Sequence, residues 1–127
     1  MLIKPKVLIV DDDEDILQFI EFLINSNQDC KCHLLTATSG KEAIKIIQIH
    51  NVSLIFLDYY LPDINGYELC RQIKQNPNTC HIPIHLFSAA LSAADLERED
   101  FRFDGIIPKP FNNEDFLRLI KENLNPV

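Results

Sequence analysis

Residues 53–62 read SLIFLDYYLP, an uncharged run that leads directly into Asp58 and is closed by Pro62. A continuous apolar run of this length that ends at a turn is typical of a strand buried on both faces of a parallel sheet. In open α/β sheets, ligands bind beyond the carboxyl ends of the strands. We therefore expect Asp58 to lie in a functional site that the other informative residues serve.

The composition is that of an acidic globular domain. The chain has 127 residues, of which 46% are hydrophobic, so we expect one domain with a substantial core. The net charge of −7 argues against direct binding of nucleic acid or of anionic membranes. A signal peptide is absent, and no apolar run approaches the roughly 18 residues of a membrane helix, which predicts a cytoplasmic protein. The four cysteines lack Cys-x-x-Cys spacing, which favours reduced thiols over zinc or disulfides.

Strand and helix patterns alternate five times along the chain. The predicted strands cover residues 6–10, 31–36, 53–58, 82–87 and 103–108. Helical spacing of apolar residues follows each of them, after the N-cap candidates Asp13, Ser39 and Asn112, after the turn at residues 62–66, and over residues 91–99. This alternation predicts a parallel sheet with helices on both faces, joined by right-handed crossovers.

Polar residues recur at the predicted carboxyl ends of these strands. Asp11 and Asp12 follow the first strand, Asp58 ends the third, Ser88 ends the fourth and Lys109 follows the fifth. In a parallel sheet these ends share one edge, where clustered carboxylates repel one another and require a cation. Oxygen ligands suit Mg²⁺. A carboxylate nucleophile, Mg²⁺, a lysine and a hydroxyl together predict a phosphoryl-transfer site.

On these residues the chain resembles the response-regulator receiver domains of two-component signalling, in their single-domain form. The matching positions are Asp11, Asp12, Asp58 with Pro62 and Gly66 beyond it, Ser88 with Ala89, and Lys109 with Pro110 and Phe111. The resemblance covers essentially the whole chain. It implies one receiver domain over residues 1–127 without an effector domain. It also implies a flavodoxin-like, three-layer α/β fold, with a five-stranded parallel sheet of order 2-1-3-4-5 flanked by five helices.

The resemblance also implies how Asp58 would be used. Asp58 would accept a phosphoryl group from a phosphohistidine on a sensor histidine kinase or a histidine phosphotransfer protein, and the chain would be a phosphoacceptor regulator rather than an enzyme. Asp12 and Asp58 would bind Mg²⁺, or Mn²⁺ in its place, with Asp11 bound through water. The backbone carbonyl of Tyr60 would be a further protein ligand of the metal.

The remaining positions would read the phosphoryl group. Ser88 and Lys109 would contact its oxygens, Ala89 would leave room for it, and the Lys109–Pro110 peptide bond would be cis. A downstream protein would bind the face made by the fourth helix, the fifth strand and the fifth helix. The chain would be a monomer or a weak, phosphorylation-dependent dimer.

Three positions depart from the family pattern or remain unexplained. Ile106 stands three residues before Lys109, where the family usually carries an aromatic ring that turns inward. Tyr60 lines the access to Asp58, and we hypothesise that it shields an acyl phosphate from hydrolysis. His85 lies in a strand expected to be buried, where an imidazole needs a partner that the sequence does not identify.

Other functions fit the sequence less well. An aspartyl-phosphate phosphatase usually carries a second aspartate two residues after its nucleophile, and Tyr60 occupies that position. A flavodoxin-like cofactor carrier would need a phosphate-binding loop after the first strand, where residues 11–15 are all acidic. A receiver-like docking domain that does not cycle phosphate remains an alternative, although every residue required for phosphorylation is present.

Overall fold

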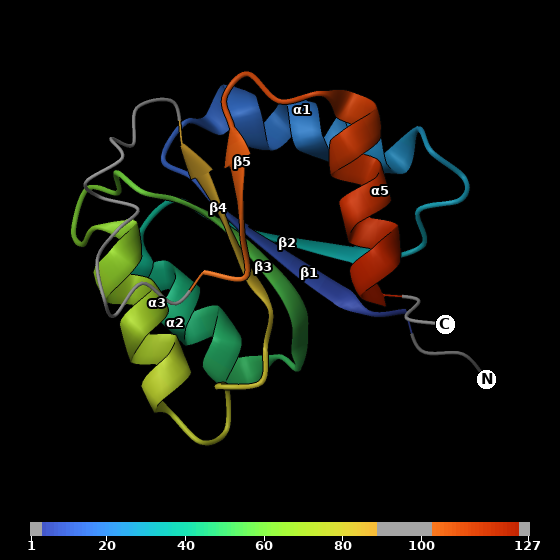
Figure 1. Cartoon of the computed structure of the whole chain (residues 1–127). Helices are drawn as coiled ribbons and strands as arrows, with labels where there is room; N and C mark the ends of the chain where they lie inside the picture. Colours follow the sequence, from blue (N-terminus) through green and yellow to red (C-terminus); the bar gives the residue numbers. More distant parts are fainter. Residues whose placement is uncertain (1–3, 89–102, 125–127) are drawn as a thin grey trace.

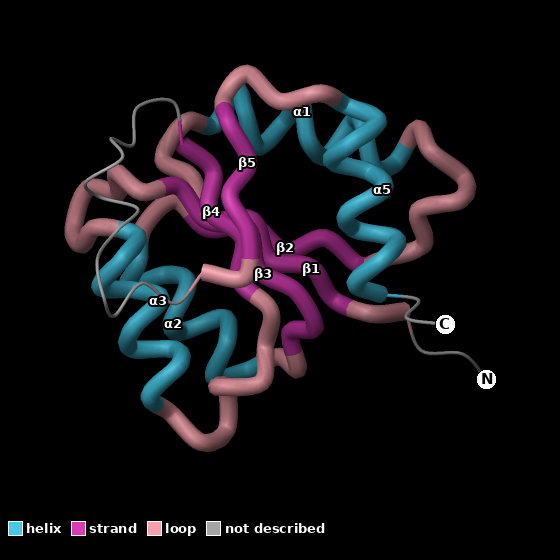
Figure 2. The backbone as a smooth tube through the Cα atoms, viewed as in Figure 1, coloured by secondary structure: helices cyan, strands magenta, loops and turns pink. Residues whose placement is uncertain are grey.

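The central layer is a five-stranded parallel sheet (Figures 1 and 2). The computed structural model of the chain describes residues 4–88 and 103–124. The strands are β1 (Lys6–Val10), β2 (His33–Ala37), β3 (Val52–Asp58), β4 (Ile84–Ser88) and β5 (Gly105–Pro108). They are ordered β2-β1-β3-β4-β5 and every neighbouring pair is parallel, which confirms the predicted topology.

Strands β2, β4 and β5 begin at residues 33, 84 and 105, later than the predicted starts at 31, 82 and 103. For β4 and β5 the reason is a contact between Ile84 and Asp104. The side-chain carboxylate of Asp104 accepts a hydrogen bond from Ile84 N at 2.7 Å, while Asp104 N donates to Ile84 O at 2.7 Å. A side chain therefore takes the place of a backbone carbonyl at this end of the sheet, and regular pairing begins only beyond it.

Helices cover both faces of the sheet, as predicted (Figure 1). The described helices are α1 (Glu14–Asn25), α2 (Gly40–Ile49), α3 (Gly66–Gln75) and α5 (Asn113–Leu124). The predicted N-caps are confirmed, because Asp13, Ser39 and Asn112 each accept a backbone hydrogen bond from the first turn of the following helix. The predicted helix over residues 91–99 lies outside the described residues, so four of the five predicted helices are seen in the described part of the chain.

Two apolar layers hold the sheet between these helices. One layer packs against α2 and α3, and the other, which contains Phe56, Phe87 and Phe116, packs against α1 and α5. Residues 54–57 of β3 are completely buried, which confirms that this strand is covered on both faces. Asp58 therefore follows directly on a completely buried segment of the sheet. Within residues 4–88 and 103–124, none of the helices has the length and apolar character needed to cross a membrane.

His85 is buried inside this core, with 6% of its surface exposed. Its ring stacks on Phe56 at a centroid distance of 5.5 Å, and neither ring nitrogen makes a hydrogen bond of normal geometry. A Cβ atom at Gly105, the partner of His85 on β5, would collide with the imidazole. Burial lowers the pKa of His85, although the carboxylate of Asp104 and the side chain of Asn123 oppose this. The imidazole is thus held neutral by apolar packing.

Candidate functional site

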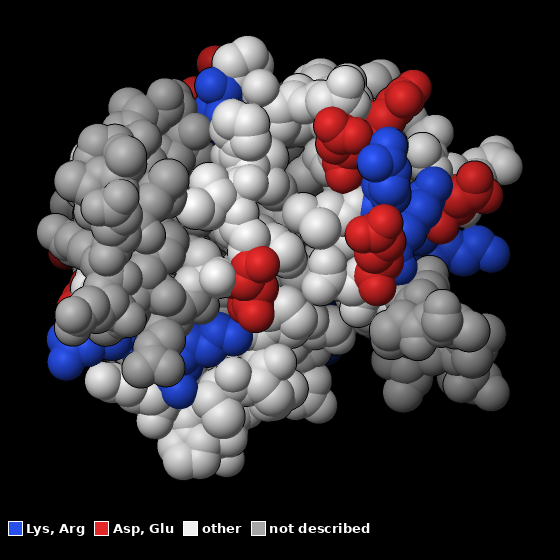
Figure 3. Space-filling model, viewed as in Figure 1, with Lys and Arg blue, Asp and Glu red and all other residues white. Residues whose placement is uncertain are grey.

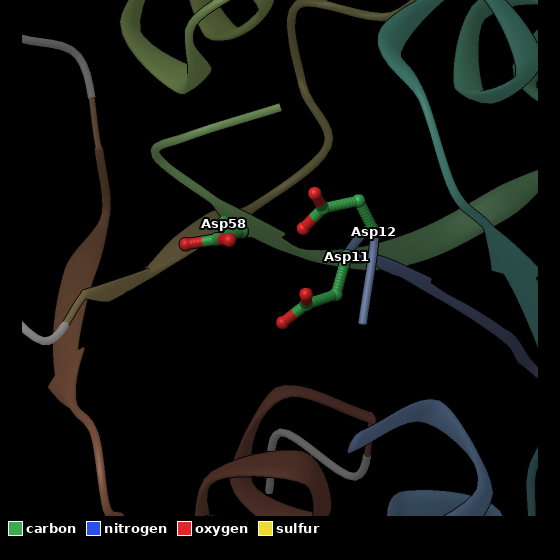
Figure 4. Close-up of side chains that lie close together, drawn as sticks. All are labelled: Asp11, Asp12 and Asp58. Atoms are coloured by element: carbon green, nitrogen blue, oxygen red, sulfur yellow. The ribbon is translucent and has the colours of Figure 1, made fainter. Parts of the chain in front are cut away.

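Three carboxylates meet at the carboxyl edge of the sheet (Figure 4). Asp11 and Asp12 follow β1, and Asp58 ends β3, which is the neighbour of β1. Each residue offers an oxygen that lies within 4.8 Å of the others. Asp11 is completely buried, Asp58 is partly buried and Asp12 is exposed. The sheet topology therefore brings together side chains that lie far apart in the sequence, as predicted.

Lys109 is the cation of this cluster. Its Nζ lies 2.8 Å from Asp11 Oδ2 and 3.5 Å from Asp58 Oδ1. The Lys109–Pro110 peptide bond is cis, as the resemblance implied. One ammonium beside three carboxylates leaves two net negative charges, which is the charge that a divalent cation would neutralise. The donor set consists of carboxylate oxygens, the ligands that Mg²⁺ prefers.

The ionisation of the site reflects burial and these charges. Burial raises the pKa of Asp58; the ammonium of Lys109 lowers it, and the carboxylate of Asp11 raises it again, so that the net change is upward. Burial alone would lower the pKa of Lys109, but its hydrogen bond to Asp11 and the charges of both aspartates raise it. Lys109 is therefore held protonated in the site, while Asp58 resists ionisation more than an ordinary carboxyl group.

The chain turns sharply immediately after Asp58. Gly66 N donates a hydrogen bond to Tyr59 O at 2.6 Å, and Tyr60 and Asn65 form an isolated antiparallel bridge. A Cβ atom on Gly66 would lie 2.6 Å from the carbonyl oxygen of Asp58, so no larger residue fits here without displacing backbone. Tyr60, two residues after Asp58, is 59% exposed, so its side chain lies at the surface.

The other predicted site residues divide into two groups. Ser88 is the last residue of β4, and its side chain lies outside the described residues, as does all of Ala89. Ile106 is 43% exposed on β5, so this position is a surface position in the structure.

Sequence reasoning missed the role of Asp63, whose carboxylate accepts hydrogen bonds from backbone N–H groups at the start of α2. Aspartate is common in turns, so its presence in this turn cluster did not indicate a contact with another helix.

The fold is a flavodoxin-like α/β sheet, and an acidic cluster and a lysine lie at its carboxyl edge. This arrangement is typical of proteins that bind cations and phosphoryl groups. The chain belongs to the response regulator receiver domain family, whose model matches residues 7–121. Receiver domains are signalling modules of two-component systems, and they bind Mg²⁺ in this acidic cleft.

Individual relatives agree with this assignment. The chain is 36% identical over 121 residues to response regulator ArlR from Staphylococcus saprophyticus, covering 94% of this chain and 52% of that protein. It is 35% identical over 122 residues to histidine kinase P4 from Formosa agariphila, covering 95% of this chain and 9% of that protein. The chain thus spans about half of the first relative and a small part of the second.

A solved structure has the same fold. The receiver domain of a sensor histidine kinase from Pseudomonas aeruginosa PAO1, which holds a magnesium ion in its active-site cleft, superposes with a TM-score of 0.83. The match covers 96% of this chain and 98% of that chain at 21% identity, so it supports the fold.

Proposed function

We propose that this chain is a phosphorylation-dependent signalling module in which Asp58 accepts a phosphoryl group from a phosphohistidine of a histidine kinase or a histidine phosphotransfer protein. One observation carries the proposal. The Asp58 carboxylate lies within 4.8 Å of two further carboxylates and 3.5 Å from the Lys109 ammonium, at the carboxyl edge of the sheet. A nucleophile, a cation-binding cluster and a fixed positive charge are the parts that phosphoryl transfer needs.

The residues of the cluster would hold Mg²⁺. Asp12 and Asp58 would bind it directly, Asp11 through water, and the Tyr60 carbonyl would complete the protein ligands. When bound, the metal would neutralise the negative charge of the phosphoryl oxygens. The net charge of the cluster and its oxygen-only donors support this assignment.

The chemistry needs few protein groups. An oxygen of Asp58 attacks phosphorus, the phosphorus–nitrogen bond of the phosphohistidine breaks, and the imidazole leaves with the electron pair and takes up a proton. Lys109 then exchanges part of its contact with Asp11 and Asp58 for a phosphoryl oxygen. The hydroxyl of Ser88 donates a hydrogen bond to a second phosphoryl oxygen. The chain is thus a regulator that catalyses only its own phosphorylation and dephosphorylation.

The output surface would include β5 and α5, together with residues 91–99, which lie outside the described residues. A groove of about 480 Å³ between β5 and α5 is lined by the exposed Ile106 and by Phe111 and Leu119. Figure 3 shows basic and acidic side chains interleaved over α5 beside a largely uncharged surface. A downstream protein with an apolar contact residue and a charged rim would suit this face.

Acetyl phosphate and Mg²⁺ provide the test. We expect the intact mass of the chain to rise by one phosphoryl group, and Asp58→Asn to abolish this gain. Asp13→Asn is the matched control, because Asp13 neighbours the cluster but caps α1 instead of joining it, and it should be phosphorylated like the parent. No mass gain in the parent, or an equal gain in Asp58→Asn, would reject the proposal and favour a docking domain that does not cycle phosphate.

A further inference from the structure

The loop after Asp58 is held at its base and at its tip by different contacts. This β3–α3 loop comprises residues 59–65. Its base is closed by the Gly66 N to Tyr59 O hydrogen bond and by the bridge between Tyr60 and Asn65. Asn65 is fixed in turn, because its side chain accepts a hydrogen bond from Glu68 N at 2.8 Å and caps α3. These contacts hold both ends of the loop, but they do not involve its tip.

Asp63 attaches the tip to α2. Its Oδ1 accepts a hydrogen bond from Gly40 N at 2.9 Å, and its Oδ2 accepts one from Lys41 N at 2.9 Å. Ser39 Oγ accepts the next N–H of the first turn, that of Glu42, at 3.1 Å. The free N–H groups of the first turn of α2 are therefore shared between its own N-cap and a carboxylate from a distant loop.

Two further observations support this contact. The hydrogen bonds from Gly40 and Lys41 lower the pKa of Asp63, so the carboxylate is ionised and interacts favourably with the positive end of the helix dipole. A Cβ atom on Gly40 would collide with the side chain of Ile64, which packs partly buried against the core. Glycine at position 40 thus provides the space in which the tip of the loop rests on α2.

We propose that Asp63 is a positioning residue for the metal site, which it serves by holding the β3–α3 loop so that the Tyr60 carbonyl faces the acidic cluster. The inference rests on the proposed function, which assigns that carbonyl to the metal. Tyr60 lies at the base of the same loop, three residues before Asp63. Leu61 and Ile64 pack partly buried against the core, and Asp63 supplies the two hydrogen bonds from the loop to the backbone of α2. The bridge to Asn65 still holds Tyr60 when the two Asp63 hydrogen bonds are lost, but the chain that links Tyr60 to the tip is then less restrained, so the carbonyl would sample a wider range of orientations.

The test is the affinity for Mg²⁺, measured by isothermal titration calorimetry on the full chain in metal-free buffer. Residues that orient metal ligands from outside the coordination shell change metal affinity by about 10–100-fold. We expect Asp63→Ala to raise the Kd for Mg²⁺ by roughly tenfold, at the lower end of that range, because a backbone ligand is only loosened. Asp63→Asn keeps one of the two acceptors, and we expect an intermediate increase.

Two control variants separate positioning from other effects. Ser39→Ala removes the neighbouring cap of α2 without touching the loop, and Glu42→Gln removes an adjacent exposed charge from the same helical turn. Both should bind Mg²⁺ within about twofold of the parent. A Kd within about twofold of the parent for Asp63→Ala, or an equal increase in either control, would overturn the inference.

A second readout uses the phosphorylation rate with acetyl phosphate at increasing Mg²⁺. Asp63→Ala should shift the half-saturating Mg²⁺ concentration upward and retain the rate at saturating Mg²⁺, which a general loss of folded protein would not do. A lower rate at every concentration with an unchanged half-saturation point would overturn the inference. If the parent chain itself does not bind Mg²⁺, the metal-dependent function fails as well; if the parent binds and Asp63→Ala binds equally, only the positioning role fails.

Discussion

Replacing Asp58 with asparagine should stabilise the metal-free protein, although it removes the proposed phosphoacceptor. The reason is electrostatic. Asp58 lies in a partly buried position beside two other carboxylates, and its pKa is raised, mainly by burial and against the effect of Lys109. A carboxyl group whose pKa is higher in the folded than in the unfolded state destabilises the fold once it is ionised. Asparagine is nearly isosteric and carries no charge.

The size of the effect follows from the distances. Each pair of carboxylate oxygens lies within 4.8 Å, so at an effective dielectric constant of about 20 each pair costs at least about 3.5 kcal/mol. The Lys109 contact at 3.5 Å contributes about 5 kcal/mol in the opposite direction. The repulsion from the neighbouring carboxylates thus offsets much of the attraction to Lys109, and solvent screens the part that comes from the exposed Asp12. Desolvation of the Asp58 carboxylate, the main cause that raises its pKa, then makes the net effect of the charge destabilising. We expect the Asp58→Asn variant to be about 1–2 kcal/mol more stable, with a Tm about 3–8 °C higher.

Urea and thermal unfolding in EDTA at neutral pH and low salt measure this difference. As the pH falls through the raised pKa of Asp58, the folded parent takes up a proton more readily than its unfolded chain, so the parent should approach the stability of the variant. Mg²⁺ should act in the same direction, since a ligand at 100 times its Kd stabilises the folded state by about 2.7 kcal/mol. The parent should gain more from Mg²⁺ than the variant.

Asp13→Asn is the control for these measurements, because it removes a neighbouring charge outside the cluster and keeps a good N-cap. Its stability should stay within about 0.5 kcal/mol of the parent. A lower stability of Asp58→Asn in EDTA, or a gain that persists unchanged at acidic pH, would refute the conclusion that the buried charge of Asp58 destabilises the metal-free fold.

Three further changes test separate parts of the structure. Tyr60→Asn should shorten the lifetime of the phosphorylated chain several-fold, since an exposed tyrosine beside Asp58 would shield the acyl phosphate; an equal or longer half-life by mass spectrometry would contradict this. Burial lowers the pKa of His85 below its ordinary 6.5. As the pH falls below about 6.5, the unfolded chain therefore protonates this imidazole before the folded chain does, and the folded state loses stability. His85→Leu should remove this part of the pH dependence of urea unfolding between pH 7.5 and about 5, and identical slopes would exclude it. Gly66→Ala should destabilise the chain by about 1–3 kcal/mol, because its Cβ would lie 2.6 Å from the Asp58 carbonyl oxygen; an unchanged urea midpoint would show that α3 moves freely.

Local patterns predicted most of the fold and the centre of the site. The uncharged run before Asp58 and the helix caps at Asp13 and Ser39 are short-range signals that depend on neighbouring residues, and the structure confirms them. The meeting of Asp11 with Asp58 required one more step, the rule that parallel strands end at the same edge of a sheet. Both kinds of reasoning need no knowledge of side-chain packing.

Contacts that depend on how side chains of distant segments pack could not be predicted in this way. Asp63 accepts hydrogen bonds from the backbone N–H groups of residues 22 and 23 positions earlier in the chain. An aspartate in an exposed turn does not indicate which distant backbone groups it will bind. Gly40 directly follows the predicted N-cap Ser39, and the close approach of Ile64, which excludes a larger side chain at position 40, could not be predicted from that pattern. The space that Gly105 leaves for His85 depends on strand register, which sequence patterns alone do not specify.

The isoleucine at position 106 bears on how a change at Asp58 reaches the rest of the molecule. Ile106 is exposed and has no ring that could turn into the site. Lys109 directly follows β5 and binds two of the three carboxylates, so among the described residues it joins the acidic cluster to this edge of the sheet. Two residues further on, Phe111 packs against Phe116 of α5 at a centroid distance of 4.9 Å. A phosphoryl group on Asp58 that drew Lys109 away from Asp11 would therefore act on a segment already packed against α5, and such coupling would need no aromatic ring at position 106.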